Sequence, residues 1–316
     1  MSQKLVLRAA GRTDIGRNRP TNEDATLVRA DLGLYAVLDG AGGHRSGEVA
    51  SALAARSIEN YFGATIRRTH DSPEFDRFGI PAGARRLSAA IMKANRDVIE
   101  IASQTPEHKG MGTTVVALSF SPRSSLLHVG HVGDSRCYRL RGGQLELMTH
   151  DHSLARDVLE QRPDLDDSVL DRLPQNIVTQ ALGLTPKLRV DLRSHRIVPG
   201  DRFLLCSDGL SGPVDEDALH EALAADDATD AIVGNLIDLA NGAGGHDNIG
   251  VVVVIVEAGQ PDESQPPATE RPMRPEPMRS DPELLILGIE ELDLGGMTSA
   301  SDEILGALKR VVKKPS

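Results

Sequence analysis

Acidic residues stand at five places where the chain turns or where an apolar run begins or ends. They are Glu23-Asp24, Asp39-Gly40, Asp134-Ser135, Asp208-Gly209 and Asp247-Asn248. Carboxylates delivered to strand ends can converge in the fold, and such a cluster is unfavourable unless positive charge lies between its members. Oxygen ligands without a set of His or Cys residues favour a hard cation, Mg²⁺ or Mn²⁺. The sequence therefore predicts a metal-dependent enzyme.

The segments that would position these carboxylates show strand-like and helix-like patterns from about residue 4 to residue 258. Strands are predicted at 5–10, 25–30, 34–38, 113–120, 126–132, 135–141, 144–148, 189–198, 202–206 and 249–256, and helices at 48–62, 82–102, 215–225 and 229–241. The Gly142-Gly143 pair between two strand-like segments is typical of a hairpin. Runs of strands joined by turns, with the helices grouped apart from them, favour antiparallel sheets and the α+β class.

Two parts of the chain depart from this pattern. The segment 150–184 is polar and acidic with weak helical periodicity, which is typical of a surface flap or insertion. Seven of the 18 prolines lie between Pro261 and Pro282, so 259–283 is predicted to be an extended linker. In the tail, 284–316, residues 299–312 fit a short amphipathic helix. Such a helix either packs on its own domain or docks a partner protein, and the sequence favours neither.

Length, charge and cysteine use restrict the class of protein. A chain of 316 residues can bury one large core or two smaller ones. Its net charge of -11 argues against a nucleic acid or an anionic membrane as the main partner. The sequence has no apolar run of the length of a signal peptide at its start or of a membrane span. Cys137 and Cys206 fit small buried side chains better than a disulfide framework. These features lead us to expect a cytoplasmic protein.

Six motifs, in their order along the chain, resemble those of the metal-dependent protein phosphatases, the protein phosphatase 2C-like group, and of its bacterial branch in particular. They lie at 19–24, 39–44, 110–114, 132–136, 206–210 and 247–248. The resemblance covers about residues 4–257 and not the tail, so 1–258 is expected to be a catalytic domain. It implies a four-layer α-β-β-α sandwich of two antiparallel sheets, with a metal centre at one edge.

The resemblance also implies a binuclear centre that holds two Mn²⁺ or Mg²⁺ ions. Asp39 would bridge both ions, and the Gly40 carbonyl would bind one of them. Asp208 and Asp247 would bind the other ion. Two metals so placed lower the pKa of a bridging water and present hydroxide to phosphorus.

Four further residues receive roles from the same resemblance. Asp134, together with Asp208, matches a weaker third metal site of bacterial members. Glu23 and Asp24 would act largely through metal-bound water. Arg19 matches the position that grips the substrate phosphate.

The activity implied is hydrolysis of phosphoserine and phosphothreonine on proteins, opposing a bacterial Ser/Thr kinase. Phosphorylated proteins, among them the kinase or its substrates, would then be the partners. Eukaryotic members place a His directly after the Asp-Gly pair, where this chain has Ala41. The proton for the leaving alkoxide would therefore come from metal-bound water or from another His, with His44 and His152 as candidates.

Two other functions use similar features. A pseudophosphatase would bind a partner without turnover, and the presence of Asp39, Asp208, Asp247 and Arg19 together disfavours it. A metal-dependent nuclease or small-phosphoester hydrolase would use similar carboxylates. The acidic net charge and the order of the motifs disfavour that reading.

Overall fold

The computed structural model describes residues 5–42, 46–70, 75–121, 125–162 and 177–259. Two antiparallel sheets form the centre of this region. The first consists, in spatial order, of β1 (Leu5–Asp14), β11 (Ile249–Ala258), β10 (Arg202–Cys206), β7 (Arg136–Arg141) and β8 (Gln144–Leu147). The second consists of β2 (Asp24–Arg29), β3 (Leu34–Ala41), β5 (Val115–Ser121), β6 (Leu126–Val132) and β9 (Asp191–Arg196), with β4 (Gly112–Thr113) beside β3.

The central strands are buried on both faces, which explains why they are continuous apolar runs rather than alternating ones. In β10, Phe203 and Leu205 join the core between the two sheets, whereas Leu204 and Cys206 face the opposite way into an outer core. The valines of β11 alternate in the same manner. Each sheet therefore needs a second layer over its outer face.

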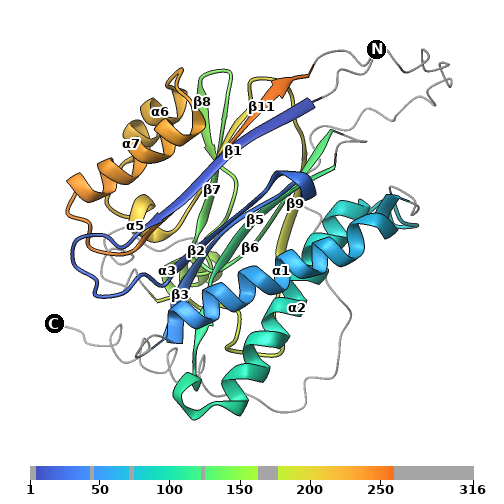
Figure 1. The fold of residues 1–316 in the computed structure, drawn as a ribbon, viewed down its shortest axis with the longest axis vertical. Helices are drawn as coiled ribbons and strands as arrows, with labels where there is room; N and C mark the ends of the chain where they lie inside the picture. The colour runs from blue at the N-terminus through green and yellow to red at the C-terminus, as the bar shows by residue number, and fades with distance from the viewer. Residues whose placement is uncertain (1–4, 43–45, 71–74, 122–124, 163–176, 260–316) are drawn as a thin grey trace. The chain divides into compact units, whose positions relative to one another are not determined.

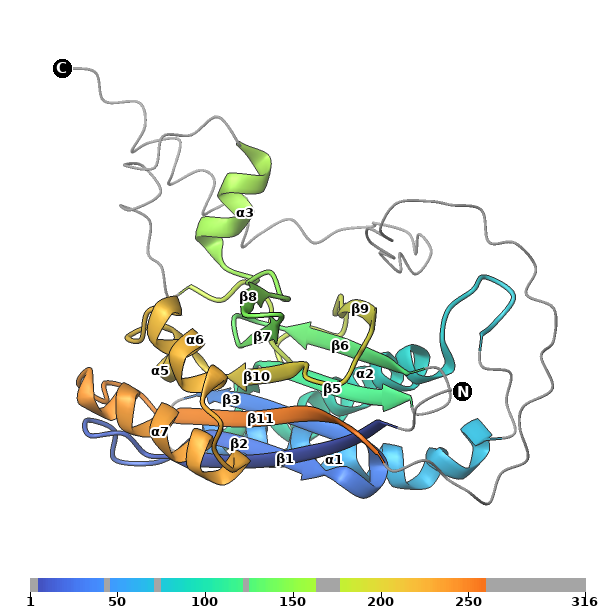
Figure 2. The same cartoon turned by 90° about the horizontal axis from the view of Figure 1, so that it is seen from above.

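Helices provide those outer layers, as Figures 1 and 2 show. Helices α1 (Ser46–His70) and α2 (Ala82–Gln104) cover the second sheet, with buried residues such as Ile58 and Phe62 of α1 recurring at helical spacing. Helices α5 (Asp208–Ser211), α6 (Glu216–Ala224) and α7 (Thr229–Gly242) cover the first sheet. The predicted α+β sandwich of two antiparallel sheets is thus confirmed.

Short elements complete the described region. They are the 3₁₀ helices η1 (Ala30–Leu32) and η2 (Pro106–His108) and the helix α3 (Leu154–Gln161). Among the described residues, no helix combines the length and apolar character needed to span a membrane.

The structure differs from the predicted elements in a few places. The strand predicted at 113–120 is divided into β4 and β5 at Thr114. The Thr114 N–H still donates to the Asp39 carbonyl at 2.8 Å, but the Asp39 N–H donates to Thr114 Oγ1 rather than to the Thr114 carbonyl. β1 extends to Asp14, and the one-turn helix α5 follows β10 directly. Within the acidic segment 150–184, α3 is helical, while 163–176 lies outside the described residues. So do 260–283 of the predicted linker and the predicted tail helix.

Candidate metal centre

The predicted carboxylates come from strand ends of both sheets that meet at one end of the sandwich (Figure 1). Asp24 begins β2 and pairs in register with Asp39 near the end of β3. Asp208 follows β10 and begins α5, and Asp134 lies in the turn between β6 and β7. Asp247 lies two residues before β11. Antiparallel pairing therefore delivers residues far apart in sequence to a single place.

Burial and mutual repulsion disfavour the charged forms of these carboxylates. Burial, reinforced by the neighbouring Asp208 and Asp247, raises the pKa of Asp24 to about 7. Burial and the Asp208 carboxylate raise the pKa of Asp134 to about 6. The pKa of Asp39 lies well above its ordinary value because Asp39 is buried and faces Asp24, Asp208 and Asp134. A cation among them would relieve this repulsion.

Two buried carboxylate oxygens fit such a cation. Asp24 Oδ1 and Asp208 Oδ1 have no hydrogen-bond partner among the described residues. The other oxygen of Asp24, Oδ2, accepts a hydrogen bond from Ser207 Oγ at 2.7 Å and is therefore satisfied. Buried polar atoms are nearly always satisfied, and unsatisfied carboxylate oxygens within an acidic cluster are the donors that Mg²⁺ and Mn²⁺ prefer.

Close backbone packing surrounds the cluster and explains its glycines. A Cβ added to Gly40 would lie 2.1 Å from the Gly47 carbonyl oxygen, and one added to Gly209 would lie 1.9 Å from the Asn248 carbonyl oxygen. Each Asp-Gly pair therefore places the chain tightly against the backbone of another segment, the start of α1 for Gly40 and the residue before β11 for Gly209.

Arg19 lies beside the cluster. Its Nη2 donates to Asp247 Oδ2 at 2.7 Å, and half of its side chain is exposed. The neighbouring Arg17 points elsewhere, since its Nε donates to the Asn241 carbonyl. Of the two arginines, Arg19 is thus the one that contacts the carboxylate cluster and is also open to solvent.

Asn248 is a residue to which sequence reasoning assigned no role. Its Oδ1 accepts from the Glu23 N–H at 2.8 Å, and its Nδ2 donates to the Ile15 and Thr21 carbonyls, each at 2.9 Å. The loop that carries Arg19 and Glu23 is therefore tied to the Asp247 turn. The only sequence signal was the Asp-Asn pair itself.

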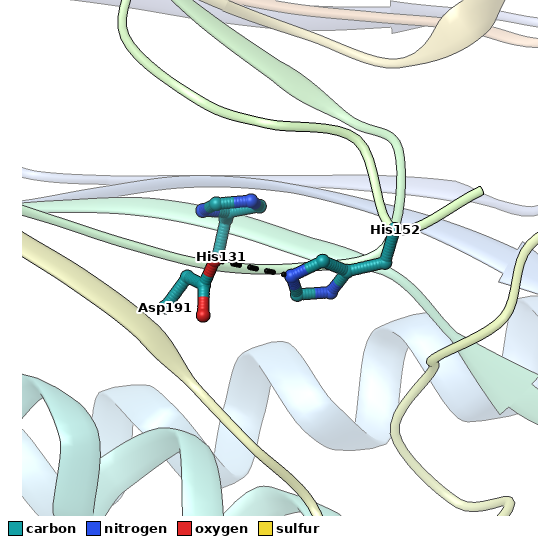
Figure 3. Close-up of side chains that lie close together, drawn as sticks. All are labelled: His131, His152 and Asp191. Atoms are coloured by element: carbon teal, nitrogen blue, oxygen red, sulfur yellow. Dashed lines mark ion pairs between the residues drawn. The ribbon is translucent and has the colours of Figure 1, made fainter. Parts of the chain in front are cut away.

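The structure describes one of the two histidines considered as proton donors. His44 lies outside the described residues. His152 is buried against His131 and Asp191, in a group that sequence reasoning did not foresee (Figure 3). Ala41 ends β3 and is exposed.

The comparisons with known proteins agree with this geometry. Residues 10–238 match the family model described as "Protein phosphatase 2C". The chain is 35% identical over 253 residues to the serine/threonine protein phosphatase PstP of Mycobacterium tuberculosis, which is 80% of this chain and 45% of that protein. It is 33% identical over 251 residues to the serine/threonine phosphatase stp of Listeria monocytogenes, covering 78% of this chain and 95% of that one.

A solved structure gives the same result. The catalytic domain of PstP in complex with two manganese ions matches with a TM-score of 0.67 and 34% identity, over 80% of this chain and 99% of that chain. The chain spans less than half the length of the M. tuberculosis relative. With the family model matching most of its length, the chain belongs to the protein phosphatase 2C family.

Proposed function

We propose that this chain is a metal-dependent protein phosphatase that hydrolyses phosphoserine and phosphothreonine. The observation that carries the proposal is the buried carboxylate cluster with two unpartnered oxygens, Asp24 Oδ1 and Asp208 Oδ1, beside the half-exposed Arg19. The PstP catalytic domain, which this chain resembles, was solved with two manganese ions. Family membership, the acidic cluster and the arginine support the same activity.

Two Mn²⁺ or Mg²⁺ ions fit the cluster. Asp39 and the Gly40 carbonyl would hold one ion, and Asp208 and Asp247 the other, with Asp39 shared between them. Asp24 and Glu23 lie beside them and would act through bound water. Asp134, near Asp208, would serve a third and weaker site. Bound there, the ions would lower the pKa of water enough to supply a nucleophile at neutral pH.

The chain's own residues would orient the substrate. The Arg19 guanidinium can present two N–H groups to the phosphate oxygens, and it stabilises the negative charge that grows on them. In the structure the Arg19 guanidinium is paired with Asp247. A bound phosphate would replace Asp247 as its partner, so the guanidinium would have an anionic partner both before and after the substrate binds. Ala41 has no proton to give, so protonation of the departing serine or threonine oxygen does not depend on that position.

The substrates would be phosphorylated proteins, and a bacterial Ser/Thr kinase would supply them. The names of the relatives in M. tuberculosis and L. monocytogenes, both serine/threonine phosphatases, support the substrate class. The kinase is the class of enzyme that makes such substrates. A signalling role in the cytoplasm fits such substrates. A pseudophosphatase, the alternative from a different class, is disfavoured because Arg19, Asp39, Asp208 and Asp247 are all present and together.

A phosphothreonine-peptide assay with Mn²⁺ tests the proposal. Wild type should hydrolyse the peptide, chelator should abolish hydrolysis, and Asp208→Asn should lower kcat/KM by roughly 100-fold or more because it removes a charge from the ion's ligands. Asp226→Asn is the matched control, an exposed Asp between α6 and α7. Activity that survives chelation would exclude the metal mechanism, and an inactive wild type would favour the binding-protein alternative.

A further inference from the structure

Three side chains from separate segments form a group outside the carboxylate cluster. His131 comes from β6, His152 precedes α3, and Asp191 begins β9. The two imidazole rings stack with centroids 4.9 Å apart, and His152 Nε2 lies 3.4 Å from Asp191 Oδ2 (Figure 3). Their ligand atoms lie within 4.8 Å of one another, a spacing that would suit a metal ion.

The hydrogen bonds around His152 disfavour a metal ion there. Gly133 N–H donates to His152 Nδ1 at 3.2 Å, so Nδ1 carries the lone pair and the proton of a neutral ring lies on Nε2. That proton points at Asp191, whose pKa is lowered to about 2, mainly by this contact. A ligating Nε2 would need the opposite arrangement, with Nδ1 as the donor. The contacts of His152 with Gly133 and Asp191 therefore hold protein groups together. We call the group of His131, His152 and Asp191, with the bond to Gly133, the clasp.

The clasp holds the turn that carries Asp134. His152 donates its own N–H to the Gly133 carbonyl at 2.9 Å, while Gly133 N–H returns a bond to Nδ1. On the far side of Asp134, Arg136 Nη2 donates to Asp151 Oδ2 at 2.7 Å. Asp134 is thus bracketed by two contacts to consecutive residues, Asp151 and His152.

The same turn is tied to the ligand Asp39. Gly133 has a φ of +106°, and a Cβ there would lie 2.6 Å from the Thr114 side chain. Thr114 Oγ1 shares a hydrogen bond with Ser135 Oγ at 2.7 Å and accepts from the Asp39 N–H at 3.1 Å. A shift of the Gly133 turn would therefore be felt at Asp39.

His152 is also joined to the other end of its own segment. Its carbonyl accepts from the Thr179 N–H at 2.8 Å, and Leu154 N–H donates to the Ile177 carbonyl at 2.9 Å. Residues that enter and leave the 150–184 segment thus meet at His152. His152 therefore joins residues 154 and 177–179 to the Gly133 turn, beside the contact that Asp151 makes with Arg136.

We propose that His152 is a positioning residue for Asp134, whose ring Nδ1 fixes the Gly133–Asp134 turn and couples the base of the 150–184 segment to the metal centre. The metal part of this inference rests on the proposed function, whereas the clasp itself does not. Because coupling between two sites is reciprocal, an ion at Asp134 should in turn steady the base of the segment.

Two isosteric variants separate the role of Nδ1 from that of the ring as packing. In His152→Asn the amide oxygen can occupy the Nδ1 position and accept from Gly133, but it cannot reach Asp191. In His152→Gln the amide lies at the Nε2 position, so the Asp191 contact is kept and the Gly133 acceptor is lost. Both variants lose the stacking on His131, which makes each the control for the other.

Amide hydrogen exchange without metal tests the clasp. We expect the Gly133 amide to exchange roughly tenfold faster in His152→Gln than in wild type, and His152→Asn to remain near wild type. Equal acceleration in both variants would overturn the proposal and leave a packing role. In wild type, Mn²⁺ should slow exchange at Gly133 and Thr179; unchanged rates at both amides would overturn the coupling even if neither variant folds.

Calorimetric Mn²⁺ binding tests the consequence for Asp134. We expect the weakest Mn²⁺ site to bind roughly three- to tenfold less tightly in His152→Gln than in His152→Asn. On an Asp134→Ala background the two variants should bind Mn²⁺ alike, because the residue being positioned is gone. A persisting difference on that background would overturn the assignment to Asp134. Failure of the phosphatase assay would leave the hydrogen-exchange result unaffected.

Discussion

Asn248 uses its whole amide to hold the loop that carries Arg19. One acceptor and two donors meet Glu23, Ile15 and Thr21, and the residue is buried. Each of these partners is a backbone group, so the loop is held whatever its side chains are. Replacing such a buried, hydrogen-bonded amide costs stability, because the backbone groups that it bonded are left without a hydrogen-bond partner.

Asn248→Asp tests this residue. The variant keeps the acceptor for the Glu23 N–H but loses both donors, leaving the Ile15 and Thr21 carbonyls facing a carboxylate. We expect a loss of about 1–3 kcal/mol in unfolding free energy. KM for a phosphopeptide should rise more than kcat falls, because Arg19 is displaced. Denaturant unfolding and steady-state kinetics measure both, with the exposed Asn60→Asp in α1 as control. A fall in kcat with KM unchanged would contradict the proposed role of the loop in phosphate binding.

Gly40 offers a second test at this scale. In Gly40→Ala the new methyl would lie 2.1 Å from the Gly47 carbonyl and 2.6 Å from the Glu23 carbonyl, both rigid backbone atoms. We expect a loss of more than about 2 kcal/mol in unfolding free energy, with weaker Mn²⁺ binding. Gly63→Ala, in α1 with nothing within 4 Å of its added Cβ, should instead stabilise by about 0.5–1 kcal/mol. Equal effects of the two substitutions on thermal unfolding would refute the close-packing argument.

At the scale of elements, strands β5, β6 and β9 are joined through a buried histidine. His128 of β6 bonds Ser121 Oγ of β5 at 3.0 Å and Ser194 Oγ of β9 at 2.8 Å. Burial, with smaller contributions from Arg86 and His195, lowers the pKa of His128 to about 4. The ring is therefore neutral in the folded state and gains a proton more readily on unfolding.

The sign of the pH effect follows from that pKa. Between about pH 6.5 and pH 4 the unfolded chain binds a proton at His128 that the folded chain does not, so stability falls as the pH falls through this window. The contribution of His128 to this change in unfolding free energy amounts to about 3 kcal/mol at most. Acids with raised pKa, such as Asp24, act in the opposite direction in the metal-free protein.

His128→Asn isolates this contribution. Urea unfolding at pH 6.5, 5.5 and 4.5 should show a shallower loss of stability on acidification in the variant than in wild type. The comparison cancels the carboxylate terms, which both proteins share. Parallel pH curves for the two proteins would show that the histidine does not titrate as its burial requires.

At the scale of the whole molecule, all described elements end by residue 259. The last described strand, β11, pairs with β1 on one side and with β10 on the other. The boundary at 258 and the docking role of the tail remain predictions, because 260–316 lies outside the described residues.

Deletion of 260–316 tests both. We expect the shortened protein to keep its unfolding midpoint and its kcat/KM on a short phosphothreonine peptide within about twofold, since domains fold around their own cores. Lower activity on a natural phosphoprotein alone would support docking by the tail. Loss of activity on the short peptide would instead show that the tail belongs to the catalytic unit.

Several features could be predicted from local sequence. Apolar runs such as 34–38 and 202–206 marked buried strands. The Asp-Gly pairs marked the strand ends to within two residues, since β3 continues through Asp39-Gly40 to Ala41 and β10 ends two residues before Asp208. Boundaries were less well predicted, because helix and strand ends depend on tertiary contacts: at Thr114 a side-chain hydroxyl replaces the backbone carbonyl as the acceptor of the Asp39 N–H. The same limit explains why Asp191 was not considered, since its partners lie on β6 and before α3.

The sequence by itself determined which residues carry charge at strand ends and, through the order of its motifs, the family. These are local properties of a few consecutive residues. Only the tertiary structure decided that Asp24 faces Asp39, that Asp208 keeps a buried oxygen free, and that His152 grips Gly133. Those relations depend on strand register and on the packing of two sheets, which arise from the summed contacts of the whole core rather than from any one segment.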